Sequence, residues 1–286
     1  MHLIQDFIIH PASFTFMQRA LVAVTLIGIV SGVMGAYVVT RGMAFLGDAL
    51  AHSILPGVAV ASLWAGNAPG ALLIGGMAAG IISAVGIGIL SRRRRLTEDV
   101  AIGIIFAGML ALGIAIISKT QNYATDLNHI LIGNILAVRD GDLLLMGFIG
   151  GVVLLVVAAL YKEFLIISFD PTLAQTLNLP DEKLRLGLLV LIALTTVIGL
   201  QAVGIALVAA MLVTPAATAR FFVKRLHHLM LLAAAIGAVG GIIGMYLAWH
   251  LEIEASAAIV LTLTAAFLLA FLFAPERGYV WSFHAA

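Results

Sequence analysis

The sequence predicts an all-α membrane protein that crosses the bilayer eight or nine times. Hydrophobic residues make up 63% of the 286 residues and charged residues only 10%, whereas soluble domains contain roughly 45–50% and about 25%. The mean hydropathy is +1.16, and the apolar runs reach the roughly 20 residues that a helix needs to span a bilayer. The absence of cysteine excludes disulfides, thiolate metal sites and iron–sulfur clusters.

Nine apolar runs follow one another without a long polar segment, so residues 1–286 are expected to form a single membrane domain. The sixth and seventh runs are barely separated, around Gln201 and Gly204. One of these two is therefore expected to be short or re-entrant, which leaves the count at eight or nine. The spans are expected at 17–39, 44–64, 71–90, 99–118, 143–161, 186–202, 203–221, 229–250 and 255–274.

The basic residues indicate the orientation of the chain. With nine crossings, all Lys and Arg residues except Arg19, Lys119 and Arg139 lie on the same side as the arginine run 92–95. Lys and Arg are enriched in cytoplasmic loops. Nine crossings therefore predict an outer N-terminus and a cytoplasmic C-terminus. Eight crossings would place the N-terminus inside unless one segment is re-entrant.

Glycines recur at four-residue spacing within the predicted helices. Such pairs let helix backbones approach closely in lipid. We expect helix packing at these positions, with sliding surfaces during gating as the alternative. The pairs are Gly28/Gly32, Gly76/Gly80, Gly237/Gly241 and Gly240/Gly244.

The segment GDALAHSILPG, residues 47–57, places ionisable side chains inside the second predicted span. Asp48 and His52 are four residues apart, so they share one face of a helix. Counted from Arg41 at 1.5 Å per residue, His52 lies about 16 Å into the span, near the midplane. Pro56 has no N–H to donate to the His52 carbonyl. Ionisable groups at this depth are costly unless they face water, protein or an ion.

A carboxylate and an imidazole together suit Mn²⁺, Fe²⁺ or Zn²⁺. Two ligands do not complete a coordination shell, but a homodimer with this face on its two-fold axis would supply two Asp and two His around a central path. We interpret Asp48 and His52 as transient metal ligands and Pro56 as a helix break beside the path. A proton relay and a pair that only hydrogen-bonds between helices are the alternatives.

The ordered motifs of the chain resemble the permease subunits of bacterial ABC importers for manganese, zinc or iron, the metal-ion ABC-3 permeases. The GDA-x-x-H-x-x-x-PG element, with Arg41, Gly42 and Met43 before it, is the most specific match. The resemblance covers nearly the whole chain, through segments 16–61, 97–114, 127–138, 169–180, 204–220 and 274–278.

The resemblance implies a pair of permeases in the bacterial cytoplasmic membrane. Each copy would bind a cytoplasmic ATPase subunit, and an extracytoplasmic binding protein would deliver the metal. The resemblance also implies that Asp48 and His52 are metal ligands along the path. Since the chain contains no G-x-x-x-x-G-K-[ST] phosphate loop, we expect no enzyme activity and no permanently bound cofactor, with ATP hydrolysed on the partner chain.

The segment FDPTLAQTLNLP, residues 169–180, is expected to form a cytoplasmic helix that couples the ATPase to transport. Asp170 suits a helix N-cap with Pro171 at the first helical position, and Leu179–Pro180 is expected to end the helix. A purely structural loop helix is the alternative. By the resemblance, the residues facing the ATPase are Phe169, Asp170, Pro171, Leu173, Ala174 and Leu177.

Other polar residues are weaker candidates. Thr214 and Pro215 lie in a segment that fits a broken helix near the inner end of the path. The resemblance implies that this segment gates the path, and a kink that only aids packing is the alternative. Four lie in outer loops and are expected at the entrance, with plain solvated residues as the alternative: Asp126, His129, Glu252 and Glu254.

The sequence therefore predicts a permease subunit that imports a divalent transition metal, with Mn²⁺ favoured slightly over Zn²⁺ and Fe²⁺. A stand-alone proton-coupled secondary carrier is the competing hypothesis. It explains the intramembrane Asp48 and His52 equally well, but it does not explain the cytoplasmic helix before Pro180.

Overall fold

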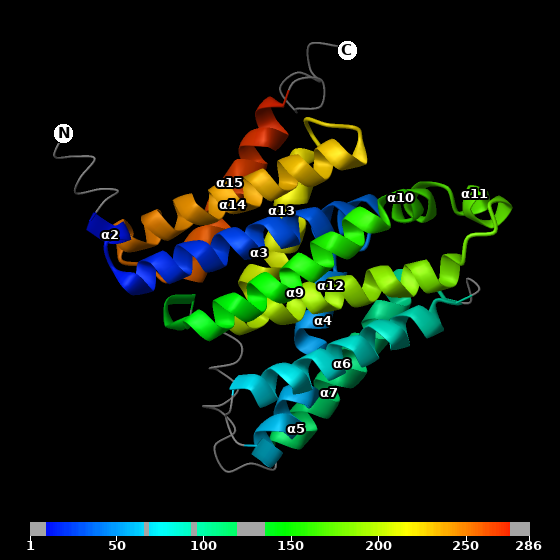
Figure 1. Cartoon of the computed structure of the whole chain (residues 1–286), viewed down its shortest axis with the longest axis horizontal. Helices are drawn as coiled ribbons and strands as arrows, with labels where there is room; N and C mark the ends of the chain where they lie inside the picture. The colour runs from blue at the N-terminus through cyan, green and yellow to red at the C-terminus, as the bar shows by residue number, and fades with distance from the viewer. Residues whose placement is uncertain (1–9, 66–68, 93–95, 119–134, 275–286) are drawn as a thin grey trace.

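The computed structural model describes residues 10–65, 69–92, 96–118 and 135–274, and helices joined by turns make up these ranges (Figure 1). The long helices are α3 (Thr15–Thr40), α6 (Pro69–Leu90), α7 (Glu98–Ile117), α9 (Asp140–Ala159), α12 (Asp181–Val203), α14 (Leu226–Leu251) and α15 (Ala255–Phe273). The shorter elements are α2 (His10–Ala12), α4 (Leu46–Ser53), α5 (Leu55–Ala65), η3 (Ile135–Ala137), α10 (Tyr161–Phe169), α11 (Pro171–Thr176) and α13 (Ile205–Ala219).

Within the part of the chain that the structure describes, eight helical segments are long and apolar enough to cross a membrane when α4 and α5 are counted together as Leu46–Ala65. The predicted polytopic all-α fold is thus confirmed. The ninth apolar helix, α13, has only 15 residues, which is about 22 Å at 1.5 Å per residue. It nevertheless connects the two ends of the molecule. The Ser256 hydroxyl donates to the Val203 carbonyl at its start, and Arg220 Nη1 donates to the Val39 carbonyl at its end.

The break between α12 and α13 lies at Gly204, whose φ of 84° and ψ of 170° belong to a region that only glycine adopts readily. We expected a broken helix at Pro215, and this expectation is wrong. Pro215 is buried inside a continuous α13. Its missing N–H affects one hydrogen bond, a loss that a membrane helix tolerates when neighbouring helices surround it.

The glycine pairs serve helix packing, as predicted. A Cβ on Gly28 would lie 2.6 Å from the Gly237 carbonyl carbon, and a Cβ on Gly32 would lie 2.6 Å from the Ala233 carbonyl carbon. These contacts join α3 to α14 along their length. Gly244 meets the Cα of Ile259 in the same way, at 2.5 Å, and thereby brings α15 against α14.

Figure 1 shows three groups of helices. α14 and α15 lie along one side, α3, α9 and α12 run through the middle, and α5, α6 and α7 form the opposite side. The short α4 passes through the interior, where it contacts α6, α7, α12 and α13. The fold therefore surrounds the segment that carries the predicted metal ligands.

Candidate functional site

The turn before α4 is built from the Arg41-Gly42-Met43 sequence. Gly42 has a φ of 74°. Its N–H donates to the Val39 carbonyl at 3.3 Å, and the Met43 N–H donates to the Val38 carbonyl at 2.9 Å. These two bonds form the glycine-dependent motif that ends many helices. The chain turns here and α4 starts only at Leu46.

This turn changes the starting point from which the position of the histidine along its span is counted. The estimate of about 16 Å assumed a helix that continues from Arg41. Since α4 begins at Leu46, His52 lies about 9 Å along the helix at 1.5 Å per residue. The whole span Leu46–Ala65 is about 30 Å long at 1.5 Å per residue, so His52 lies nearer the midpoint of the span than its start.

Only two side chains of α4 are not buried. Six of its eight residues are buried, and the exceptions are Asp48 and His52. Asp48 lies in the first turn and His52 in the last turn, the positions at which the helix dipole favours an anion and a cation respectively. The local sequence thus forms a helix that is apolar on all faces except the one bearing this pair.

The pair has the geometry of two ligands of one metal ion. His52 Nε2 lies 3.7 Å from Asp48 Oδ1, and the side chains are 25% and 39% exposed. This separation is longer than a good hydrogen bond. Two donor atoms that each bind a metal at about 2.1 Å can be up to about 4 Å apart. The i,i+4 arrangement therefore leaves room for an ion between nitrogen and oxygen.

Aromatic rings from α7 and from the turn before α4 border the pair. The His52 ring meets Phe106 edge to face, with centroids 5.7 Å apart, and Phe106 meets Phe45 in the same way at 5.5 Å. His52 Nδ1 is buried, and no hydrogen-bond partner reaches it from the described part of the chain. Phe106 therefore fixes the orientation of the imidazole through packing, a role that the sequence alone did not indicate.

The helix is interrupted directly after the pair. α4 ends at Ser53, Ile54 forms the turn, and α5 begins at Leu55 with buried Pro56 in its first turn. Proline is tolerated there because the first N–H groups of a helix have no partner within it. The predicted break is present, and it lies two residues before Pro56.

The described part of a single chain does not contain a complete metal site. Within residues 10–65, 69–92, 96–118 and 135–274, no three His, Asp or Glu side chains come together in a way that could hold a metal ion. Asp48 and His52 are thus a two-donor site that opens on one side of α4.

The predicted coupling helix is present as α11. Asp170 caps it, since Oδ1 accepts a hydrogen bond from the Leu173 N–H at 2.9 Å. Its end differs from the prediction. The helix stops at Thr176, and Asn178, with a φ of 52°, lets the Leu179 N–H bond the Ala174 carbonyl. This left-handed residue ends the helix before Leu179–Pro180 is reached.

The apolar residues near α11 divide into two groups. Phe169, Leu173 and Leu177 are 57%, 43% and 53% exposed, whereas Ala174 is fully buried. The expectation that Ala174 faces a partner is therefore wrong, because its side chain packs inside this chain. The three exposed side chains, called the α11 patch below, remain free in the single chain.

The weaker candidates fall in different places. Asp126 and His129 lie outside the described residues. Glu254 caps α15, since its two carboxylate oxygens accept hydrogen bonds from the Ser256 and Ala257 N–H groups at 2.9 and 2.7 Å. Glu252 is exposed in the left-handed turn that ends α14. Glu252 and Glu254 therefore both lie at the turn between α14 and α15.

The gate candidates lie on α13. Thr214 is half-buried and Pro215 is buried. The Thr214 carbonyl accepts a hydrogen bond from the Thr218 hydroxyl at 2.7 Å. α13 also packs against α4, so Thr214 and Pro215 lie on a helix next to the one that carries Asp48 and His52.

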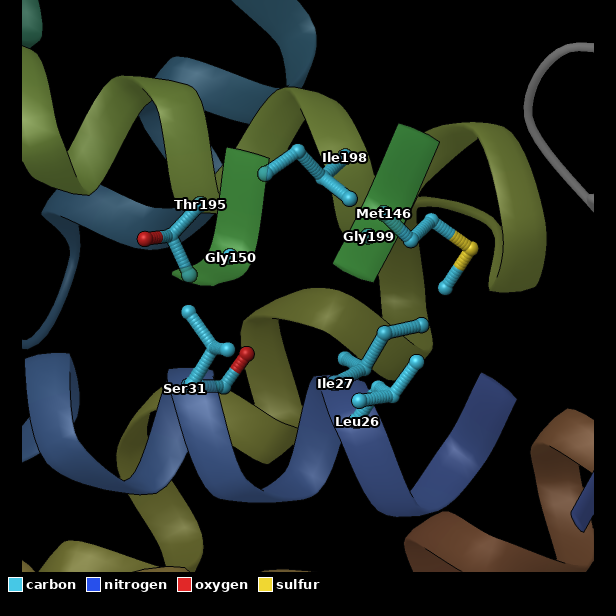
Figure 2. A pocket seen from close by; sticks show the side chains of 9 residues that line it. Leu26, Ile27, Ser31, Met146, Gly150, Thr195, Ile198 and Gly199 are labelled. Carbon is cyan, nitrogen blue, oxygen red and sulfur yellow. The ribbon is translucent and has the colours of Figure 1, made fainter. Parts of the chain in front are cut away.

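Two cavities lie away from Asp48 and His52, the two candidate metal ligands that we call the metal pair below. One, of about 10 Å³, is bordered by Ser31, Gly150 and Thr195 (Figure 2) and is about the size of one water molecule. The other, of about 500 Å³, is lined by polar side chains that include Arg41, Glu98 and Arg185. Neither contains Asp48 or His52.

The described basic residues gather at the end of the molecule that carries α10 and α11, on the right in Figure 1. Arg19 and Arg139 lie at the other end, where Arg19 pairs with Asp140 at 2.6 Å. Hydrogen bonding to Glu182 raises the pKa of the exposed Arg92 guanidinium at the basic end. The residues that define the basic end lie at or next to helix ends: Arg41 after α3, Arg92 after α6, Lys162 in α10, Lys183 and Arg185 in the first turns of α12, Arg220 after α13, and Lys224 and Arg225 before α14.

Comparison with known proteins gives consistent matches over nearly the whole chain. The model of the family described as ABC 3 transport family matches residues 13–274. The chain is 44% identical over 269 residues to the manganese transport system membrane protein MntC of Listeria monocytogenes, covering 94% of each chain. It is 36% identical to the chelated iron transport system membrane protein YfeD of Yersinia pestis, covering 96% of this chain and 90% of the relative.

A solved structure matches the fold closely. The structure titled PsaBC from Streptococcus pneumoniae in complex with Fab aligns with a TM-score of 0.83 and 37% sequence identity. The alignment covers 98% of this chain and 99% of the solved chain. The arrangement of helices described above is therefore that of a transporter membrane subunit.

Proposed function

The chain belongs to the ABC 3 transport family as the membrane subunit of a metal-ion importer, and from this premise we propose that its cargo is Mn²⁺. The manganese transport named for MntC of Listeria monocytogenes, at 44% identity, supports this choice over the iron transport named for YfeD, at 36% identity. The Asp–His donor set is compatible with both metals and with Zn²⁺.

The observation that carries the proposal is the 3.7 Å separation of His52 Nε2 and Asp48 Oδ1 on the otherwise buried α4. These atoms bind the ion during its passage. Two copies of the chain around a two-fold axis bring two such pairs together and provide four donors. Each half-site alone is too incomplete to hold the metal tightly, which suits an ion that must leave.

The basic end faces the cytoplasm. Lys and Arg are enriched on that side of membrane proteins, and the Lys and Arg residues at the helix ends named above belong to this end. The C-terminus then lies in the cytoplasm and the turn between α14 and α15 outside. An extracytoplasmic binding protein delivers the metal to the outer side.

Energy comes from a separate ATPase subunit, because this chain lacks the phosphate-binding loop motif. The α11 patch of Phe169, Leu173 and Leu177 lies at the basic end and is exposed, as a docking surface for a cytoplasmic subunit must be. Binding and hydrolysis of ATP on that subunit move α11 and change the side to which the metal path opens.

The test is metal uptake into vesicles that contain this chain with its candidate ATPase and binding protein. We would measure Mn²⁺, Zn²⁺ and Fe²⁺ uptake with and without ATP for the unmodified chain, Asp48→Ala and His52→Ala. His228→Ala is the control, since this histidine stacks on His227 at the basic end. We expect ATP-dependent Mn²⁺ uptake that both site variants lose and the control keeps.

Other outcomes contradict specific parts of the proposal. Uptake that persists in both Asp48→Ala and His52→Ala places the metal path elsewhere. ATP-driven uptake of Zn²⁺ or Fe²⁺ in place of Mn²⁺ changes the cargo. Uptake driven by a pH gradient without ATP favours the proton-coupled carrier.

A further inference from the structure

Three side chains that are far apart in the sequence meet at the basic end of the molecule. Glu98 Oε1 accepts a hydrogen bond from Arg41 Nη2 at 2.8 Å and lies 3.3 Å from Arg185 Nη1, which also donates to it. The three side chains are mostly buried, with 23%, 11% and 18% of their surfaces exposed. One carboxylate oxygen therefore connects the end of α3, the start of α7 and the first turns of α12.

The two arginines depend on Glu98 to different degrees. Arg185 is also held by the end of α6, because it donates to the Gly88 carbonyl and to the Ser91 hydroxyl, both at 2.9 Å. The Arg41 guanidinium bonds Glu98, and its Nη1 is buried without a partner in the described ranges. The position of Arg41 therefore depends on Glu98, whereas Arg185 stays on α6 without it.

The cluster lies between the α11 patch and the metal pair. Arg185 stands on the helix that follows α11 after a four-residue connection. Arg41 stands in the turn that precedes α4. Glu98 begins α7, and Phe106, two helical turns later, contacts the His52 ring. Glu98 is thus connected to α4 in two ways, through Arg41 in the turn before α4 and through Phe106 on α7.

The surroundings leave space for movement. The cavity of about 500 Å³ is lined by all three members of the cluster together with Gln175 of α11 and Asp181 at the start of α12. Because side chains do not fill this space, α11 and the start of α12 can move and enlarge or close the cavity without displacing packed side chains. The ion pairs of Glu98 with Arg41 and with Arg185 join the walls of this cavity directly.

We propose that Glu98 is a positioning residue that transmits movement of α11 and α12 to the metal pair on α4, an inference that rests on the proposed import function. When the start of α12 moves, the distance between Arg185 and Glu98 changes. Because Arg41 bonds the same Glu98 oxygen, Arg41 and the start of α7 move as well. The turn before α4 and the Phe106 ring then shift together, and Asp48 and His52 move between orientations that accept and release the ion.

The test measures Mn²⁺ uptake and ATP hydrolysis in the same vesicles, with the ATPase and binding protein present. Glu98→Gln keeps the shape of the side chain and removes its charge. We expect uptake per ATP hydrolysed to fall at least about fivefold, within the usual range of coupling between sites, while ATP hydrolysis and assembly of the complex persist. Glu182→Gln is the control, because it breaks the exposed Arg92 pair on the same turn of α12 and should change the ratio less than about twofold.

Further variants separate coupling from folding. Arg41→Gln with Glu98→Gln also removes the arginine charge that depends on Glu98 alone, while Arg185 keeps its bonds to Gly88 and Ser91, so we expect this double variant to assemble even where Glu98→Gln does not. If the two residues act as one unit, the double variant has the same low ratio as Glu98→Gln. An unchanged ratio, an equal loss of hydrolysis and uptake, or failure of both variants to assemble overturns the inference. Absence of ATP-driven uptake by the unmodified complex refutes the proposed function instead.

Discussion

Replacing Gly28 with alanine tests the close packing of α3 on α14. The new Cβ would lie 2.6 Å from the Gly237 carbonyl carbon and 2.7 Å from the Ala238 nitrogen. Carbon atoms in good contact are about 3.5–4.0 Å apart, so the two helices must separate by about 1 Å. Both contacts are to backbone atoms, and no side chain can rotate away to relieve them.

The expected cost follows from this overlap. Overpacking of a well-packed interface costs about 1–3 kcal/mol. Alanine also favours the helix by about 1 kcal/mol relative to glycine, so the clash must be measured against a matched change. Gly151→Ala is that control, because Gly151 is exposed on α9 and a Cβ there meets nothing within 4 Å.

Thermal unfolding of the purified protein in detergent measures the difference. A change of 1 kcal/mol shifts Tm by about 2–4 °C in domains of 150–250 residues, so Gly28→Ala should melt about 2–12 °C below Gly151→Ala. Equal melting temperatures for the two variants would refute the packing of α3 directly on the α14 backbone.

Three further predictions test other parts of the structure. Leu173→Asp and Leu177→Asp should each weaken co-purification of the ATPase by about tenfold or more, as loss of a central apolar contact does, while Thr172→Asp has little effect; equal binding in all three would rule out the α11 patch. Asn178→Ala should lower stability by about 1–2 kcal/mol because Asn178 is left-handed, whereas Asn178→Gly should not; calorimetry that finds no difference contradicts this end of α11. Glu254→Ala should lower stability by about 1 kcal/mol through loss of the α15 cap and leave the KM for metal uptake unchanged, whereas a raised KM would point to a role at the entrance.

The spans were predictable because the bilayer imposes length and apolarity on each helix separately. The expected spans 99–118 and 255–274 correspond to α7, Glu98–Ile117, and α15, Ala255–Phe273. The Asp170 cap was predictable for the same reason, since a cap depends on residues within one turn. The Asp48 and His52 spacing likewise fixes a shared helix face.

Features that depend on contacts between distant segments were not predictable. Arg41 and Glu98 are 57 residues apart and Arg185 and Glu98 are 87 apart, and nothing in the local sequence pairs them. Burial of Ala174 depends on what packs against α11, and the contact of Phe106 with His52 depends on how α7 lies on α4. The boundary at Gly204 was predicted from the interruption around Gln201 and Gly204, whereas the break expected at Pro215 is absent because α13 continues through this buried residue.

The burial of α4 explains why the metal pair is both isolated and incomplete. An ionised side chain in the centre of a membrane helix costs about 2.5–3.5 kcal/mol, so a fold that buried Asp48 and His52 with the other six residues of α4 would be less stable. Their open face avoids that cost and leaves coordination positions for a second chain or for water. A complete four-ligand site in one chain would hold the metal as structural zinc is held. In the dimer that we propose, ligands shared between two chains would let a small relative movement of the chains release the ion without the unfolding of a helix.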